Sequence, residues 1–100
     1  MNGLTRMTRS CGGELAFGDP VAYRRTGVEI LGRIYGFGGI PYDGVYPHVY
    51  LITPQGEVAE FGRGWIHSLH GADLQRLRNI EGQVEVPYSD PRTGEPLWPL

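Results

Sequence analysis

Glycine and proline punctuate this sequence along its whole length, and their spacing limits the fold more than any other feature. The chain has 16 glycines and 8 prolines in 100 residues, which is about twice average usage. They are spread out rather than clustered, so they indicate turns between short apolar or alternating segments. No helical segment is long enough to connect parallel strands. A small antiparallel β-barrel or β-sandwich is therefore predicted.

Strand-like composition recurs in five segments: Val21–Arg24, Val28–Phe37, Val45–Thr53, Glu57–Phe61 and Val84–Val86. Gly32 and Gly36 inside the second segment predict a bulge or sharp bend. Pro47 in the third predicts an edge position or a late start at His48. The run Thr53-Pro54-Gln55-Gly56-Glu57 predicts a hairpin turn in which Gly56 takes a positive φ.

A single domain at residues 15–87 is expected, with a disordered leader at residues 1–14 and an extended Pro-rich tail at residues 88–100. The segment from Asp73 to Arg78 predicts one short helical turn with Asp73 as its N-cap. One cysteine, Cys11, excludes an internal disulfide. No membrane span and no secretory signal are recognised, so a cytoplasmic protein is expected.

Three short stretches resemble the SH3-like barrels. They are Gly18-Asp19-Pro20-Val21, Leu31-Gly32-Arg33-Ile34 and Gly56-Glu57-Val58. The resemblance extends from about Phe17 to Leu69 and concerns the fold alone. It implies a mostly β, small SH3-like five-stranded antiparallel barrel with one short helical turn and extended termini.

The charge of the chain argues against a dedicated nucleic-acid-binding domain. The net charge is −2, and all nine basic residues are arginines without a basic run. The densest basic spot is Arg24-Arg25. Nucleic-acid binding through Tyr23, Arg24, Arg25 and Arg33 is kept as an alternative function.

Catalytic and metal-binding patterns are weak. His67 and His70 have the i, i+3 spacing of a helical metal pair, but only His48, Cys11 or a carboxylate could complete the site. No Ser-His-Asp spacing and no phosphate-binding loop is present. We therefore expect a non-catalytic protein with no cofactor and no metal.

Aromatic residues gather around the Gly-rich loop that follows the second predicted strand. Tyr35, Tyr42 and Tyr46 surround this loop, which also contains Asp43. Aromatic side chains beside a carboxylate suit the binding of a peptide or a cation. The other reading is that these tyrosines are core residues or half-exposed edge residues.

A second candidate element is the corner Gly62-Arg63-Gly64-Trp65, because arginine and tryptophan are common interface anchors. The alternative is that the glycines allow Trp65 to fold into the core. Taken with the tyrosine loop, Arg63 and Trp65 predict a module that binds a protein or peptide. A homo-oligomer whose ligand or active site is shared between subunits remains a further alternative.

Overall fold

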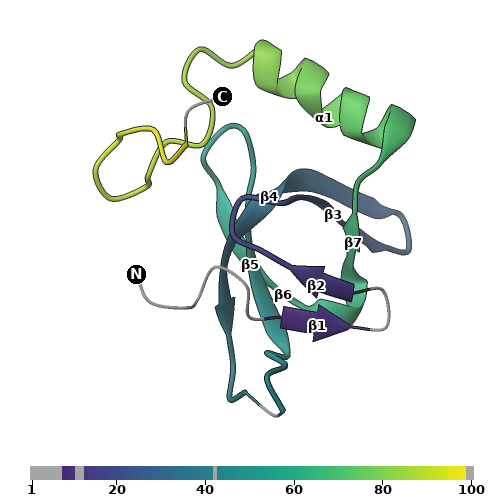
Figure 1. Ribbon diagram of the computed structural model, residues 1–100. Coiled ribbons are helices and arrows are strands. Elements are labelled where there is room, and N and C mark those ends of the chain that lie inside the picture. The colour runs from purple at the N-terminus through teal and green to yellow at the C-terminus, as the bar shows by residue number, and fades with distance from the viewer. Residues whose placement is uncertain (1–7, 11–12, 42, 99–100) are drawn as a thin grey trace.

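The computed structural model describes residues 8–10, 13–41 and 43–98 of the chain. Its elements follow one another as β1 (Thr8–Ser10), β2 (Gly13–Leu15), β3 (Pro20–Arg25), β4 (Val28–Gly38), β5 (His48–Ile52), β6 (Val58–Gly62), the 3₁₀ turn η1 (Arg63–Trp65), β7 (Ile66–Ser68) and α1 (Gly71–Gly82) (Figure 1). Within these residues no helix is long and apolar enough to cross a membrane.

Five strands form one open antiparallel sheet in the order β6-β5-β4-β3-β7. Strands β3 to β6 follow each other as neighbours, and β7 returns to pair with β3 from Val21↔Ser68 to Tyr23↔Ile66. β1 and β2 form a separate hairpin. The predicted mostly β, antiparallel class is confirmed in this coarser form.

Local turn chemistry explains where the strands end. Gly56 has a φ of 93°, and the Thr53 N–H donates to the Glu57 carbonyl at 2.8 Å, so the predicted hairpin turn is confirmed. β5 starts at His48, directly after Pro47, as the proline predicts. The register of β4 against β5 shifts between Ile34 and Gly36, which is the predicted bulge.

The sheet carries an apolar cluster on each face. One cluster joins β2, β3, β4, β5 and β7, and its buried members are Leu15, Val21, Ile34, Val49, Leu51 and Ile66. The other joins β3 to α1 and contains Ala22, Leu69 and Leu77. Figure 1 shows α1 lying across one end of the sheet, while the β4–β5 hairpin extends away from the opposite end. These two ends offer different surfaces to a partner.

Two predicted elements need correction. The helix is not one turn at residues 73–78 with Asp73 as its N-cap but twelve residues long, with His70 at the N-cap position. Leu77 packs against Ala22 and Leu69, and Glu81, beyond the predicted end, is buried and bonded to Arg33 of β4. The fifth strand is β7 and not Val84–Val86, whose residues lie in bends after α1. Ile66 is 2% exposed in β7, so burial favours this segment as the strand.

Both ends of the chain differ from their predictions. Strands β1 and β2 form within the segment that was predicted as a disordered leader, and residues 1–7 lie outside the described part. Residues 88–98, predicted as an extended tail, fold back instead. The Tyr88 N–H donates to the Pro54 carbonyl at 3.1 Å, and Tyr88 is fully buried.

Candidate functional site

The loop at residues 39–47 lies against η1 at the far end of the sheet. The Arg63 N–H donates to the Pro47 carbonyl at 2.9 Å. Gly39 has a φ of 85°, and a Cβ there would lie 2.6 Å from Pro47 Cγ, so this position needs glycine. The close approach brings loop residues and η1 onto one surface.

Trp65 is the main exposed aromatic side chain on this surface. It is 44% exposed, and the Arg25 Cζ lies 4.9 Å from its ring centroid, which is a cation–π geometry. Arg25 has no carboxylate partner among the residues that the structure describes. Its charge is therefore not neutralised by a carboxylate within this part of the chain.

Arg63 lies in η1 with Trp65, and Tyr46 comes directly before Pro47, whose carbonyl accepts from the Arg63 N–H. Tyr46 is half-buried, and its ring centroid lies 6.4 Å from that of Phe37. Arg63 Nη1 donates to the Ile66 carbonyl at 2.8 Å, and burial lowers the pKa of Arg63. Arg63 thus holds η1 against the start of β7. We call the surface made by Arg25, Tyr46, Arg63 and Trp65 the rim.

The structure brings together some, but not all, of the residues predicted as a binding site. Tyr46, Arg63 and Trp65 lie on the rim. Tyr35 is half-buried in β4, and Asp43 is exposed in the loop with a φ of 53°. The prediction for Tyr42 falls on a residue outside the described part.

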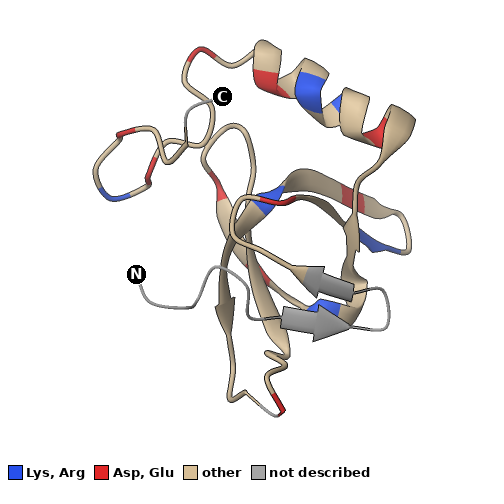
Figure 2. Ribbon diagram, in the orientation of Figure 1, with Lys and Arg blue, Asp and Glu red and all other residues tan. Residues whose placement is uncertain are grey.

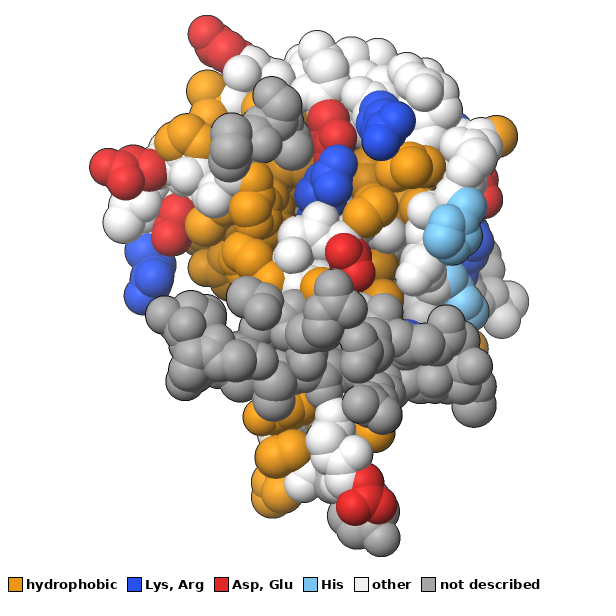
Figure 3. Space-filling model, in the orientation of Figure 1, with side chains coloured by type: hydrophobic (Ala, Val, Ile, Leu, Met, Phe, Trp, Pro, Cys, Tyr) orange, Lys and Arg blue, Asp and Glu red, His pale blue; other side chains and the backbone are white. Residues whose placement is uncertain are grey.

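Sequence reasoning missed two features of this end. Arg25 reaches Trp65 only because β3 pairs with β7, and no spacing in the sequence indicates that pairing. Ile40 is 86% exposed in the loop. Figure 3 shows hydrophobic side chains on the projecting hairpin, below the residues drawn in grey. The sequence signal for this feature was an isoleucine between a Gly-Gly pair and a proline, because such a loop residue has few neighbours to bury it.

Two of the arginines considered for nucleic-acid binding are engaged in ion pairs. Arg24 Nε lies 2.8 Å from Glu29 Oε2, and Arg24 Nη2 lies 3.2 Å from Asp73 Oδ2. Arg33 Nε lies 2.8 Å from Glu81 Oε2. Figure 2 shows acidic and basic residues interspersed over β4 and α1 at this end of the molecule. No continuous basic surface is formed by these side chains.

A buried polar network joins the sheet, α1 and the C-terminal segment. Arg33 bonds Glu81 through two nitrogens and also donates to the Gly18 carbonyl at 3.0 Å. The Tyr88 hydroxyl donates to Glu81 Oε2, the oxygen that also accepts from Arg33 Nε. Burial raises the pKa of Tyr88, and the hydrogen bond to Glu81 raises it further. All three side chains have partners, so this network holds the fold together.

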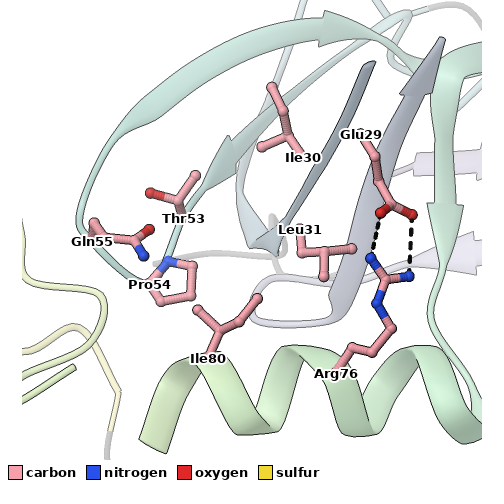
Figure 4. A pocket seen from close by; sticks show the side chains of 8 residues that line it. All are labelled: Glu29, Ile30, Leu31, Thr53, Pro54, Gln55, Arg76 and Ile80. Carbon is pink, nitrogen blue, oxygen red and sulfur yellow. Dashed lines mark hydrogen bonds and ion pairs between the residues drawn. The ribbon is translucent and has the colours of Figure 1, made fainter. Parts of the chain in front are cut away.

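Hollows between α1 and the sheet are also lined by paired charges. One of about 320 Å³ lies between α1 and β4, and in Figure 4 Ile80, Leu31 and Pro54 face into it. The Glu29–Arg76 ion pair lies at its side. Another, of about 480 Å³, is lined by Glu81 and Arg33 of the buried network, and by Arg78, Gly82, Val84 and Pro87. Neither hollow holds a buried polar group left for a ligand.

The histidines do not form a metal site in the described residues. His67 is exposed in β7, and His70 precedes α1 as its N-cap residue. No group of three His, Cys, Asp or Glu side chains that could hold a metal ion occurs among these residues. Ser68 and His70 share a hollow of about 290 Å³ with Asp19, but the described part contains no hydrogen bond that links these three side chains. This arrangement does not activate a nucleophile.

Comparisons with known proteins give no match: neither a family model, nor a curated protein, nor a solved structure is significantly similar to this chain.

Proposed function

We propose that this chain is a small, non-catalytic binding module of the SH3-like kind, which docks an extended segment of a partner protein on the rim. Its strand order supports the SH3-like assignment. Four strands follow one another as neighbours, a 3₁₀ turn comes next, and the last strand pairs back onto the first. The long strand β4 is bent at a bulge, which is how one sheet folds over its own core.

The observation that carries the proposed function is the exposed pair of Arg25 and Trp65. A tryptophan that is 44% exposed leaves a large apolar face in water. Covering this face with a partner would remove it from water and so favour binding. Arginine and tryptophan are also the residue types most enriched among interface hot spots. The contact at 4.9 Å holds both side chains in place before a partner binds.

The chemistry of the pair supports one class of partner. An exposed indole suits a proline or aliphatic side chain of an extended peptide, the contact used by aromatic-lined peptide grooves. Arg25 suits an aspartate or glutamate next to that residue. We therefore propose an extended, proline-containing and acidic segment as the ligand.

A display library of twelve-residue peptides tests this function. Each peptide carries a fixed Pro-x-x-Pro core flanked by aspartate and glutamate, and the selected peptide is titrated into ¹⁵N-labelled protein. The chain has only two tryptophans, so two indole N–H signals are present. We expect the Trp65 signal to move, while the Trp98 signal, from a ring packed against Phe17 and Tyr88, stays in place.

Variants separate a specific rim from general charge attraction. Trp65→Ala should weaken binding by roughly thirtyfold, which corresponds to about 2 kcal/mol. Arg25→Glu should weaken it strongly, whereas the matched charge reversal Arg92→Glu, on an arginine that is 83% exposed in the C-terminal segment, should have little effect. Equal effects of the two reversals, or a library without a binder that needs Trp65, would contradict the proposal.

A further inference from the structure

Strand β6 forms one edge of the five-stranded sheet. Val58–Gly62 pairs with β5 along its whole length, and no strand lies on its other side among the described residues. Val58, Ala59 and Glu60 are all exposed. The strand therefore presents one row of backbone groups to its surroundings.

The hydrogen bonds at both ends of β6 identify which residues provide that row. Glu57 accepts from the Thr53 N–H at 2.8 Å, and the Arg63 N–H donates to Pro47 at 2.9 Å. Residues that bond their neighbour alternate along an antiparallel strand. The register between these two pairs is continuous from Ile52↔Val58 to His48↔Gly62.

It follows that Ala59 and Phe61 direct their backbone groups toward β5. Val58, Glu60 and Gly62 direct theirs outward. Val58 and Glu60 each offer one N–H donor and one C=O acceptor, and Gly62 offers its N–H, because its C=O is at the N-cap of η1 and accepts the first bond of that turn. Outside the helices and strands, no backbone hydrogen bond to the outward groups occurs in the described part of the chain. The spacing of alternate residues is the one that an added strand requires.

Natural edge strands are usually protected by proline, by lysine or by a bulge. β6 has none of these, and its register with β5 is regular. Its one charged residue is Glu60, whose side chain is 45% exposed and lies 3.6 Å from His48. Exposed Glu57 precedes the strand, and half-buried Arg63 follows it with its guanidinium bonded to the Ile66 carbonyl. The exposed charges along the edge are therefore the two glutamates.

We propose that β6 is a second interaction site, which binds an extended basic segment of a partner as an added β-strand. Opposite charges on facing residues stabilise a strand pair, so a lysine or arginine opposite Glu60 favours this partner. A second copy of the chain is disfavoured. Antiparallel pairing centred on Glu60 would place two glutamates opposite each other. The site uses backbone groups and does not depend on the rim.

The decisive variants are at Gly62. Its φ of −63° already suits proline, and a Cβ there would make ordinary contact with Trp65 at 3.5 Å. Gly62→Pro therefore keeps the β5–β6 ladder, removes one outward N–H and places a ring where a partner strand would pair. Gly62→Ala adds the same Cβ but retains the N–H, so it is the matched control.

The probe is a blocked peptide of alternating lysine and valine, added to ¹⁵N-labelled full-length protein while amide hydrogen exchange is measured. We expect slower exchange at Val58, Glu60 and Gly62, with little change at Ala59 and Phe61, which are already bonded to β5. Gly62→Pro should weaken binding at least about tenfold, and Gly62→Ala should leave it within about twofold. Glu60→Gln should weaken it by about threefold, and less at high salt.

Three results would overturn the proposal. One is equal binding by the Gly62→Pro and Gly62→Ala proteins, with both spectra showing a folded domain. Another is protection that appears without peptide as protein concentration rises, because this would identify a second copy as the occupant. The last is absence of protection at Val58 and Glu60 at millimolar peptide. If Gly62→Pro disturbs the fold, Val58→Pro, which removes another outward N–H, replaces it.

Discussion

The surface covered by α1 and the rim treat their charged and aromatic side chains in opposite ways. On the surface covered by α1, Arg24 and Arg33 have carboxylate partners, and Tyr88 is buried with its hydroxyl bonded. On the rim, Arg25 lies over an indole that is 44% exposed. Adjacent residues of one strand, Arg24 and Arg25, thus belong to different surfaces because side chains alternate across a sheet.

This difference separates the structural use of these residue types from the binding role that we propose for the rim. A buried charge destabilises the fold unless it is paired, so the buried side chains under α1 must keep their partners. An exposed cation and ring carry a small folding cost and remain available for binding. Substitutions under α1 should therefore lower the free energy of unfolding, whereas substitutions on the rim should weaken binding.

Removing Glu81 should have the largest effect. In Glu81→Ala the Arg33 side chain, 16% exposed, loses its carboxylate and keeps only the Gly18 carbonyl. We expect the free energy of unfolding to fall by about 4 kcal/mol. Urea denaturation measures this, with Glu85→Ala, an exposed glutamate of the following segment, as the control. Similar losses of stability in the two variants would contradict the distinction between buried, paired charges and exposed ones.

The two tryptophans provide the next comparison. Trp98 packs edge-on against Phe17 and Tyr88 at centroid distances of 5.1 and 5.2 Å, and we expect Trp98→Ala to cost about 3 kcal/mol. Trp65→Ala on the rim should cost about 1 kcal/mol or less. Thermal or urea unfolding of both proteins checks the order. A greater loss for Trp65 would make it a core residue and not a binding residue.

Tyr88→Phe tests the hydroxyl alone. Loss of its hydrogen bond to Glu81 should cost about 2 kcal/mol near neutral pH. Burial raises the pKa of Tyr88 above its ordinary value of about 10, so the folded chain keeps a proton that the unfolded chain releases. This contribution is complete below about pH 10 and is lost as the pH rises above it.

Above pH 10, the stability of the unsubstituted protein should consequently fall more steeply than that of Tyr88→Phe, by up to about 1.4 kcal/mol per pH unit. Urea denaturation at pH 9 to 11.5 gives both slopes. Parallel pH profiles would mean that the Tyr88 hydroxyl ionises as readily in the folded chain as in the unfolded one.

Local features of the fold were predictable from sequence, whereas features that depend on distant contacts were not. Pro47 and Gly56 act through their own backbone geometry, so the start of β5 and the following turn were predicted. The helix continues past Arg78, where Glu81 is buried and bonded to the distant Arg33 of β4. β7 has three residues, too few for an alternating pattern, and it exists through its pairing with β3.

The candidate site follows the same rule. Aromatic composition indicated Tyr46 and Trp65, but the partner of Trp65 is Arg25, which only the β3–β7 pairing brings close. The Arg33–Glu81 pair spans 48 positions, and no motif links residues so far apart. Which charges are paired and which remain open is therefore a property of the folded chain.

The smallest effect on stability is expected at the exposed ion pairs that Glu29 makes with Arg24 and Arg76. Hydrogen bonds from Arg76, and then from Arg24, lower the pKa of Glu29, so its contribution is present above about pH 4.5 and is lost as the pH falls below that value. These side chains are solvent-exposed, and we expect Glu29→Ala to cost only about 0.5 kcal/mol at pH 7. Urea denaturation in low salt and in 1 M NaCl should show this loss shrinking as screening increases. A salt-independent loss of stability close to that of Glu81→Ala would place Glu29 with the buried network. Pairing under α1, and not burial of the charge, would then decide how much a carboxylate contributes to stability.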